Sequence, residues 1–532
     1  VRDEIGRIST VSEASLGIIA KPSFVGPARH AKVEYGNGLA LDEAYDAAAR
    51  PVSMRVEDAQ HNVIAGFEVG YDRAGQKLYE RRLHDQGKGE LYQYDSANRL
   101  IASSQGVMNS EQHIGEPMPG AFSNHVTYAI DPVHNWSSRV EYRDPSNTAL
   151  NISRTYAPNT LNQYAAMSKA VDGGAPSNTS FVYDEAGNLI DDGKYRYTYD
   201  DRNLVTEVRN AITDDIVTQY SYDALRRRTS ELRADGKVTA FIYDGWQEVQ
   251  EITDGTLTAS YIYDDGIDHP IAMIANGHAY YYHADSRNNI AAITDESGAL
   301  VERYAYDPYG AATITDTNGN VQNDSTIGNA YRFSSRRYDE ATGLYYYRHR
   351  MYSPQLGRFL QRDPEWYVDG MNVYVYVGNN PILWIDPYGL SKGATDLHGY
   401  TQKDFGKALE AAGIVMDASS VTVTSLRAFE IGGKGLLYIS KGMTYFSTVS
   451  TAYNIYEGVT QGDALKTVSA GMDLTIGIAT LAIESESPAA AAAITVVYVG
   501  GKWGILTVPD GYGGQNITEY SNGGAGAVRM WP

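Results

Sequence analysis

FVYDEAGNLI, residues 181–190, is the stretch that decides the fold. Its first half, Phe181–Tyr183, places two aromatic side chains on either side of a valine, an alternation typical of a β-strand. Asp184 can accept hydrogen bonds from nearby backbone amides, and the Gly and Asn that follow tolerate the left-handed backbone of a tight turn. Leu189–Ile190 then begins a returning strand, so the stretch predicts a β-hairpin.

Related hairpin units recur along the chain, each marked by the dipeptide Tyr-Asp. From Tyr183 to Tyr263, the tyrosines of successive Tyr-Asp pairs are 16, 23, 21 and 20 residues apart. The copies include those at Tyr45, Tyr71, Tyr94, Tyr183, Tyr199, Tyr222, Tyr243 and Tyr263. A single hairpin is marginally stable in water, but hairpins that stack side by side bury a continuous face. The repeats therefore predict a mainly β protein.

Tyrosine is unusually frequent, and the repeats account for it. The 532 residues include 43 Tyr but only 10 Phe and 6 Trp, and 35 of the 43 Tyr lie in residues 1–390. A tyrosine combines an apolar ring with a polar end. We therefore expect the repeat tyrosines to pack their rings on the sheet and to keep their hydroxyls in water or hydrogen-bonded.

Composition excludes several classes of function. The chain has no Cys, which rules out disulfides, Cys-ligated metal centres and a Cys nucleophile. Its net charge of −21 argues against a general nucleic-acid binder. We find no cofactor motif, no metal site and no uncharged run long enough to span a membrane. The chain begins at Val1 without an initiator Met or a signal peptide, so we interpret it as a piece of a longer reading frame.

Two longer stretches carry a specific resemblance. YYYHADSRNNIAAITDESGALVERYAYDPYG (280–310) resembles the Rhs/YD-repeat family, and YRFSSRRYDEATGLYYYRHRMYSPQLGRFLQRDPEWYVDGMNVYVYVGNNPILWIDPYGLS (331–391) resembles its Rhs repeat-associated core domain. Relatives include bacterial polymorphic toxins, the C component of Tc toxins and teneurins. The resemblance implies a spiralling β-sheet shell over 1–310, incomplete at this length, a core domain with a self-cleavage motif over 311–390, and a variable C-terminal domain over 391–532.

Two aspartates at the end of the core are the candidate catalytic residues. Asp363 and Asp386 both precede a proline, and two carboxylates held close together can supply the base and the acid that peptide hydrolysis requires. They are 23 residues apart, so only the tertiary fold can bring them together. The resemblance implies Arg350 as their partner and cleavage between Leu390 and Ser391. The alternative is that each Asp-Pro pair is a plain turn motif.

The residues after 390 have a different composition, rich in Ala, Gly, Ile, Val and Thr. We expect a small, mostly α-helical domain, with helices over 401–417, 428–458 and 463–484 and a helix or a hairpin over 488–508. Three roles remain open for this tail. It is a passive domain packed inside or beside the shell, a membrane-active effector, or an enzyme without a recognisable motif.

These features together predict a secreted or surface-delivered polymorphic toxin of interbacterial competition. In this hypothesis the shell carries its own C-terminal tail as cargo and releases it by aspartate-dependent autoproteolysis. The partners that it implies are a cognate immunity protein, a specialised secretion machinery and a membrane contacted by the tail, with no nucleic acid and no cofactor. The alternative is a cell-surface structural or adhesive protein with a non-enzymatic C-terminal domain.

Overall fold

The computed structural model describes residues 1–390 apart from 4–6, 26–28, 109–121, 143–150, 172–173 and 265, and beyond residue 390 only the backbone of short strands. The chain divides into two units, Val1–Tyr400 and Thr401–Pro532. None of the helices in this described part is long and apolar enough to cross a membrane.

Two long antiparallel sheets make up most of the first unit, and in each of them the strands are ordered as in the sequence. The first sheet contains β1 (Val11–Glu13), β2 (Gly17–Val25), β3 (Arg29–Tyr35), β4 (Ala40–Tyr45), β5 (Pro51–Glu57), β6 (Val63–Tyr71), β7 (Lys77–Arg82), β8 (Lys88–Tyr94), β9 (Leu100–Val107), β10 (Phe122–Ile130), β11 (Trp136–Tyr142), β12 (Ile152–Pro158), β13 (Tyr164–Val171) and β14 (Ser177–Ser180).

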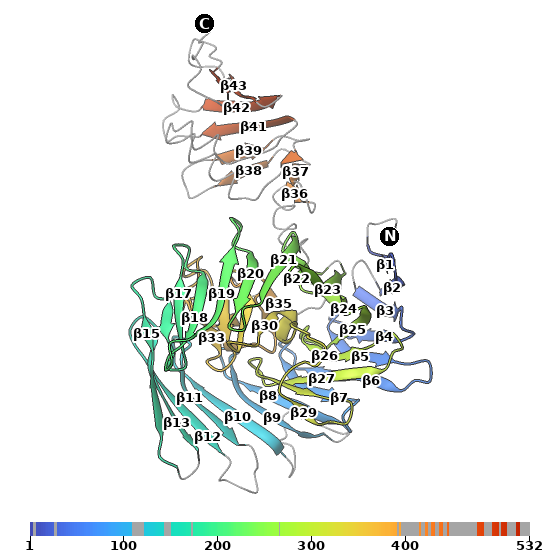
Figure 1. The fold of residues 1–532 in the computed structure, drawn as a ribbon. Helices are drawn as coiled ribbons and strands as arrows, with labels where there is room; N and C mark the ends of the chain where they lie inside the picture. The colour runs from blue at the N-terminus through green and yellow to red at the C-terminus, as the bar shows by residue number, and fades with distance from the viewer. Residues whose placement is uncertain are drawn as a thin grey trace. The chain divides into compact units, whose positions relative to one another are not determined.

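The second sheet continues the same meander. It contains β15 (Val182–Tyr183), β16 (Leu189–Asp191), β17 (Tyr195–Tyr199), β18 (Val205–Asn210), β19 (Ile216–Tyr222), β20 (Arg228–Arg233), β21 (Val238–Asp244), β22 (Gln247–Thr253), β23 (Thr256–Tyr263), β24 (Pro270–Ala275), β25 (His278–Ala284), β26 (Ile290–Thr294), β27 (Leu300–Tyr306), β28 (Ala312–Thr315) and β29 (Val321–Gln322). Strand β24 contacts β2, and β26 contacts β6, so the second sheet returns to the beginning of the first (Figure 1).

The predicted hairpin turn is present at Asp184. Its carboxylate Oδ1 accepts the Asn188 N–H at 2.7 Å, and its Oδ2 accepts the Asn188 side-chain amide at 2.8 Å. Gly187 has a φ of 86°, the left-handed conformation that ends a three-residue hairpin loop. The same bond, from the N–H four residues on to the Asp Oδ1, recurs at Asp46, Asp58, Asp72, Asp95, Asp131, Asp200, Asp223, Asp285, Asp295, Asp307 and Asp316.

The repeat tyrosines make a second recurring bond. The Tyr222 hydroxyl donates to the Val205 carbonyl at 2.8 Å, and Val205 is the first residue of the preceding strand. Equivalent bonds to the start of the preceding strand come from Tyr71, Tyr94, Tyr199, Tyr243, Tyr263 and Tyr306. A phenylalanine could fill the same space but could not satisfy that carbonyl. The prediction of bonded hydroxyls is confirmed, and it explains why tyrosine is preferred.

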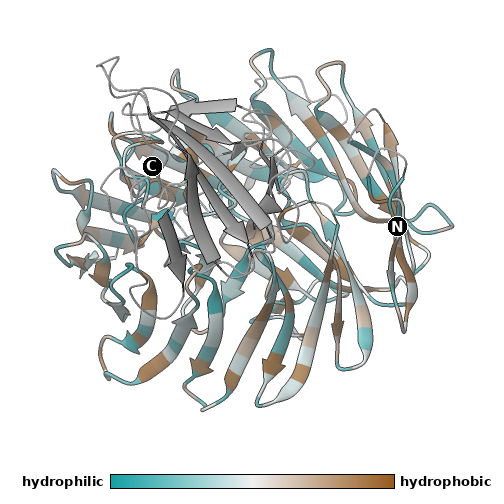
Figure 2. Cartoon of the chain, turned by 90° about the horizontal axis from the view of Figure 1, so that it is seen from above, coloured by the Kyte–Doolittle hydropathy of each residue, from teal (hydrophilic) through white to brown (hydrophobic). Residues whose placement is uncertain are grey.

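The strands alternate between buried and exposed residues, as hairpins with one covered face require. In β17, Tyr195 and Tyr197 are buried and Arg196 between them is exposed. Figure 2 shows the same alternation as brown and teal segments along the strands. The mainly β fold predicted from the repeats is therefore confirmed for the first unit.

A shorter antiparallel sheet carries the core segment, and Figure 1 shows β30 and β33 inside the curve of the long sheets. It contains β30 (Arg337–Asp339), β31 (Leu344–Tyr347), β32 (Arg350–Ser353) and β33 (Arg358–Phe359). Tyr346 belongs to one apolar cluster, which includes Tyr128 and Val208, whereas Tyr345 and Tyr347 belong to a second, which includes Tyr261, Met273, Ile293 and Tyr304. Because neighbouring residues of a strand point to opposite faces, β31 fills two cores at once.

Single-turn 3-10 helices at Phe333–Ser335 and Val377–Asn379 flank this sheet in sequence. Strand β34 (Trp384–Ile385) follows them and pairs with β35 (Gly393–Ala394). The loop between these two strands contains the predicted cleavage position.

The described parts of the second unit are strands, so no helix is present in the stretches where the expected mostly α-helical tail can be compared; elsewhere that tail stays a prediction. Strands β36 (Ile414–Met416), β37 (Val421–Val423) and β40 (Thr444–Tyr445) form one sheet, and β38 (Arg427–Glu430), β39 (Leu436–Ile439), β41 (Ile476–Ile483), β42 (Ala492–Val499), β43 (Lys502–Thr507) and β44 (Thr518–Ser521) form another.

The physical reason lies in residue type. The segment 476–483 reads IGIATLAI, and 492–499 reads AAITVVYV; both are rich in Ile, Val and Thr, whose branched side chains favour strands over helices. For 488–508, where helix and hairpin were both open, β42 and β43 pair as an antiparallel hairpin. Most of the helix expected over 401–417 lies outside the described residues; only 414–416, in β36, can be compared.

Candidate active site

The three residues singled out as catalytic lie in one buried cluster. Arg350 begins β32, Asp363 follows β33, and Asp386 directly follows β34. All three are 6% exposed or less. The bond between Arg350 and Asp386 therefore joins groups that are 36 residues apart in the chain.

One guanidinium joins the two carboxylates. Arg350 Nη2 lies 2.9 Å from Asp363 Oδ2 and 3.1 Å from Asp386 Oδ2. The face of the guanidinium lies against the Phe359 ring, with its carbon 3.6 Å from the ring centroid. A bridging cation of this kind allows two buried carboxyl groups to approach each other at a tolerable electrostatic cost.

Burial raises the pKa of Asp363 to about 6. The Arg350 charge and the Glu365 N–H, which donates to Asp363 Oδ1 at 2.8 Å, both oppose the rise, while the negative charge of Asp386 adds to it. A carboxyl group with this pKa keeps a useful fraction of its proton near neutral pH. Chemically, it can serve as a general acid.

The segment that leads to the predicted cleavage position folds back onto the same cluster. Arg350 Nε donates to the Gly389 carbonyl at 2.6 Å, and the Leu390 N–H donates to Asp386 Oδ1 at 3.0 Å. A side chain at Gly389 would lie 2.4 Å from the Tyr347 carbonyl, so only glycine fits this approach. Ser391, the other side of the predicted bond, lies outside the described residues.

Two groups in the cluster were not anticipated from the sequence. Arg348 and Asp268 form a buried ion pair, with 2.7 Å between Arg348 Nη2 and Asp268 Oδ1, and Arg348 also donates to the Pro387 carbonyl. The Arg-His-Arg spacing next to Arg350 was a signal that could have pointed to Arg348. No local signal marks Asp268, which comes from the loop before β24.

Three further titratable or charged side chains of the first unit, those of His283, Asp285 and Arg228, have structural partners. His283 Nε2 lies 2.8 Å from Thr294 Oγ1, and Asp285 binds the amides of its own turn. In the run of three arginines at 226–228, Arg228 is fully buried and pairs with Asp339 at 3.4 Å. Its side chain lies in the core from the first position of β20.

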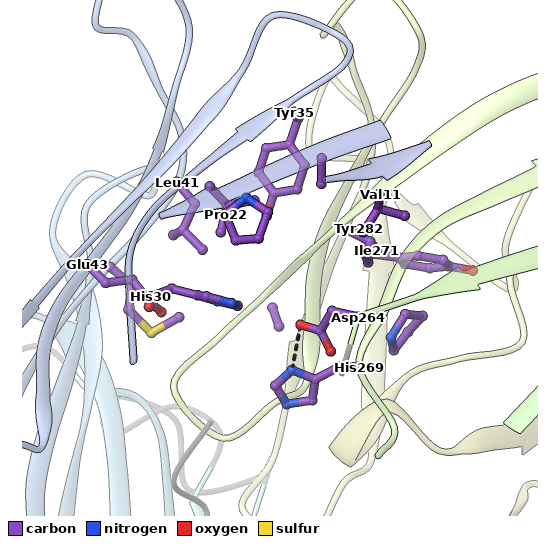
Figure 3. A pocket seen from close by; sticks show the side chains of 15 residues that line it. Val11, Pro22, His30, Tyr35, Leu41, Glu43, Asp264, His269, Ile271 and Tyr282 are labelled. Carbon is purple, nitrogen blue, oxygen red and sulfur yellow. Dashed lines mark hydrogen bonds and ion pairs between the residues drawn. The ribbon is translucent and has the colours of Figure 1, made fainter. Parts of the chain in front are cut away.

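A small cavity of about 80 Å³ lies at the seam where the second sheet meets the start of the first (Figure 3). His30 and Glu43 line it from the first sheet, and Asp264 and His269 from the loop before β24. His269 Nδ1 lies 3.4 Å from Asp264 Oδ2. Although burial opposes it, His269 lowers the pKa of Asp264 to about 2. The pair stabilises the loop that also carries Asp268.

Comparisons with known proteins agree with this architecture. Residues 139–382 match the family model described as Teneurin YD-shell. Over 271 residues, 50% of the chain, the sequence is 32% identical to the tRNA3(Ser)-specific nuclease WapA of Bacillus spizizenii, of which 11% is covered. Over 371 residues, 60% of the chain, it is 27% identical to double-stranded DNA deaminase toxin A of Burkholderia cenocepacia, of which 24% is covered.

A solved structure shares the fold. The crystal structure of TcdB2-TccC3-TEV superimposes with a TM-score of 0.51 and 18% sequence identity, covering 70% of this chain and 19% of that one. The chain thus spans a quarter or less of the length of each of these relatives. With its Tyr-Asp hairpin turns, its returning sheet and these matches, the first unit is similar to YD-shell proteins, and the match to the Teneurin YD-shell model spans residues 139–382.

Proposed function

We propose that this chain is the carrier part of a polymorphic toxin that cuts itself between Leu390 and Ser391. The observation that carries the proposal is the cluster of Asp363, Asp386 and Arg350 against the segment that ends at Leu390. In the same proposal the shell and core domain span 1–310 and 311–390, and the released domain spans 391–532.

The two carboxyl groups then have different roles. Asp386, paired with Arg350, accepts a proton from a water molecule whose oxygen adds to the Leu390 carbonyl carbon. The bond between that carbon and the Ser391 nitrogen breaks, and Asp363 donates its proton to the leaving amine. The raised pKa of Asp363 suits the acid role, because the group must arrive at the reaction with its proton.

Mass analysis of the purified chain tests the cleavage. The expected result is a fragment of 532 − 390 = 142 residues from the wild-type chain and an intact Asp386→Asn chain. Asp316→Asn, which changes a turn aspartate whose bonds stay within its own exposed turn, serves as the matched control and should cleave as wild type does. An intact wild-type chain at neutral pH would refute the proposal.

The released tail is proposed as the effector. The relatives with printed activities are named as a nuclease and a deaminase toxin, which supports a toxic role but not a particular chemistry for this tail. The proposal includes export by a secretion machinery to the cell surface or beyond, a cognate immunity protein in the producing cell, and contact of the tail with the target membrane.

Expression in a host without the immunity protein tests the effector role. Residues 391–532, expressed in the cytoplasm and separately in the periplasm, should stop growth in at least one compartment. Co-expression of a small protein encoded directly downstream should restore growth. Harmless expression in both compartments, together with uncleaved protein at the cell surface, would favour a structural or adhesive protein instead.

A further inference from the structure

We propose that Arg348 and His349, together with the catalytic Arg350, set the register of the cleavage segment by holding three consecutive backbone carbonyls. This inference rests on the proposed self-cleavage and assigns positioning roles to two residues that do not touch the reacting bond. The carbonyls belong to Pro387, Tyr388 and Gly389, which directly precede Leu390.

The contacts pair two triplets of residues, 348–350 and 387–389, in the order of the sequence. Arg348 Nη1 donates to the Pro387 carbonyl. The His349 N–H and Nδ1 lie 3.3 and 2.9 Å from the Tyr388 carbonyl. Arg350 Nε donates to the Gly389 carbonyl at 2.6 Å. Each residue of the first triplet therefore holds one carbonyl of the second, and the two triplets cannot shift by one residue without breaking all of these bonds.

Arg348 is itself held in place by the second sheet. Its guanidinium is 3% exposed and donates to Asp268 Oδ1 at 2.7 Å, to Asp268 Oδ2 at 3.0 Å and to the Trp246 carbonyl at 3.2 Å. Asp268 also accepts a bond from Arg336 at 2.7 Å. A carboxylate shared by two arginines keeps its charge even when buried, so Arg348 has a fixed anchor.

Aromatic rings cover the segment from the side. The Trp246 ring lies 5.4 Å from the His349 ring and 6.0 Å from the Tyr388 ring, measured between centroids. Burial lowers the pKa of His349 to about 4, so the ring is neutral near pH 7. In the neutral form with its proton on Nδ1, the ring donates to the Tyr388 carbonyl without placing another positive charge between two arginines.

The physical consequence is a limit on where the chain can be cut. A shift by one residue moves an extended backbone by about 3.3–3.6 Å. A misplacement of only about 1 Å can already reduce the rate of a reaction about a hundredfold. A clamp on residues 387–389 places the next carbonyl, that of Leu390, at a constant distance from Asp363 and Asp386. Arg348 thus acts on the reaction through the geometry of the segment and not through contact with the scissile bond.

The rate at which the full chain releases its fragment, measured in samples quenched at successive times, tests the proposed effect of Arg348 on cleavage. Arg348→Met should slow release about a hundredfold, and Arg348→Lys should recover part of that loss, because a single ammonium can still reach the Pro387 carbonyl. The pH midpoint of the rate should stay at the wild-type value in both variants, because Asp363 is untouched. Arg50→Met, a turn arginine of the first sheet bonded to Asp46, should release at the wild-type rate.

Hydrogen exchange tests the clamp independently of cleavage. In the Asp386→Asn chain, adding Arg348→Met should raise amide exchange in residues 384–390 and leave peptides from β17–β19 unchanged. Wild-type protection of 384–390, or equal loss of protection throughout the sheets, would overturn the clamp. So would a wild-type release rate for Arg348→Met.

The two measurements separate the clamp from the proposed function. If the wild-type chain does not cleave at all, the self-cleavage proposal fails, while selective loss of protection at 384–390 would still support the clamp as a structural device. If the wild type cleaves and Arg348→Met cleaves equally fast, the clamp fails alone. His349→Phe, which keeps the ring but removes the Nδ1 bond, gives a second variant for the case that Arg348→Met does not fold.

Discussion

Aspartates in the repeat turns and aspartates in the core segment use the same carboxyl group in opposite surroundings. Asp316, in the turn between β28 and β29, binds the Asn320 N–H and side-chain amide, and these bonds lower its pKa. Asp363, in the core, is buried beside a second carboxyl group, and its pKa is raised to about 6. The difference shows that an exposed turn, as at Asp316, lowers the pKa of a carboxyl group, whereas burial beside a second carboxyl group, as at Asp363, raises it.

The charged partners differ in the same way. In the turns, an arginine four residues on bonds to the aspartate, as Arg227 does to Asp223 at 2.7 Å. In the core, Arg350 reaches Asp386 across 36 residues, and Arg228 reaches Asp339 across 111. Local pairs stabilise one hairpin, while long-range pairs depend on the whole shell.

The largest effect on fragment release should come from replacing Asp363, the proposed proton donor. Asp363→Asn should reduce fragment release by about a hundredfold or more, because the leaving amine loses its acid. Asp316→Asn should leave release unchanged, because that turn is exposed and far from the cluster. Gel or mass quantification of the 142-residue fragment measures both. Equal release from the two variants would remove the functional distinction between turn and core aspartates.

The next largest difference should be between two adjacent arginines, Arg227 in the turn and Arg228 at the start of β20. Arg228→Met leaves the buried Asp339 without its cation and should reduce the free energy of unfolding by about 3–5 kcal/mol. Arg227→Met breaks a partly exposed turn pair and should cost less than about 1 kcal/mol. Urea unfolding of the two variants measures this. Similar midpoints would mean that the buried pair is no more important than the exposed one.

Release should also depend on pH through Asp363. Its pKa of about 6 means that the proton-bearing form falls as pH rises through 6, so the rate should fall about tenfold per pH unit above pH 7. Asp316, whose pKa is lowered by the bonds of its turn, should contribute nothing over this range. Release rates between pH 5.5 and 8.5 measure the profile. A rate that rises with pH would assign the base role to Asp363 instead.

The raised pKa of Asp363 also makes the stability of the folded chain depend on pH. A carboxyl group whose folded-state pKa lies above its ordinary value binds its proton more tightly in the folded chain, so its contribution to stability is present at low pH and is lost as pH rises towards 6.

The smallest effect should come from a single repeat hydroxyl. Tyr222→Phe removes the donor to the Val205 carbonyl and should cost about 0.5–1.5 kcal/mol of unfolding free energy. The matched control is Tyr128→Phe, because the buried Tyr128 hydroxyl has no hydrogen-bond partner among the described residues. That change should be neutral or slightly stabilising. Thermal or urea unfolding compares the two, and equal losses would show that ring packing alone explains the preference for tyrosine.

Much of the repeat region could be predicted because its determinants are local. The bond from Asn188 to Asp184 closes within five residues, so the pattern of residue types specifies the turn wherever it occurs. The burial of Arg228 could not be predicted, because its neighbours Arg226 and Arg227 have the same side chain and only the position in β20 separates them. The fold of the tail could not be predicted, because short apolar runs suit helices and strands alike.

The sequence by itself determined the hairpin turns, the use of tyrosine and the two aspartates worth testing. Only the tertiary structure decided that Arg350 joins Asp363 to Asp386 and that residues 348–350 hold the carbonyls of 387–389. The physical reason is chain distance. A hydrogen bond within one turn needs only the right residues in order, whereas a contact across 36 or more residues forms only where the curved sheets bring distant strands together.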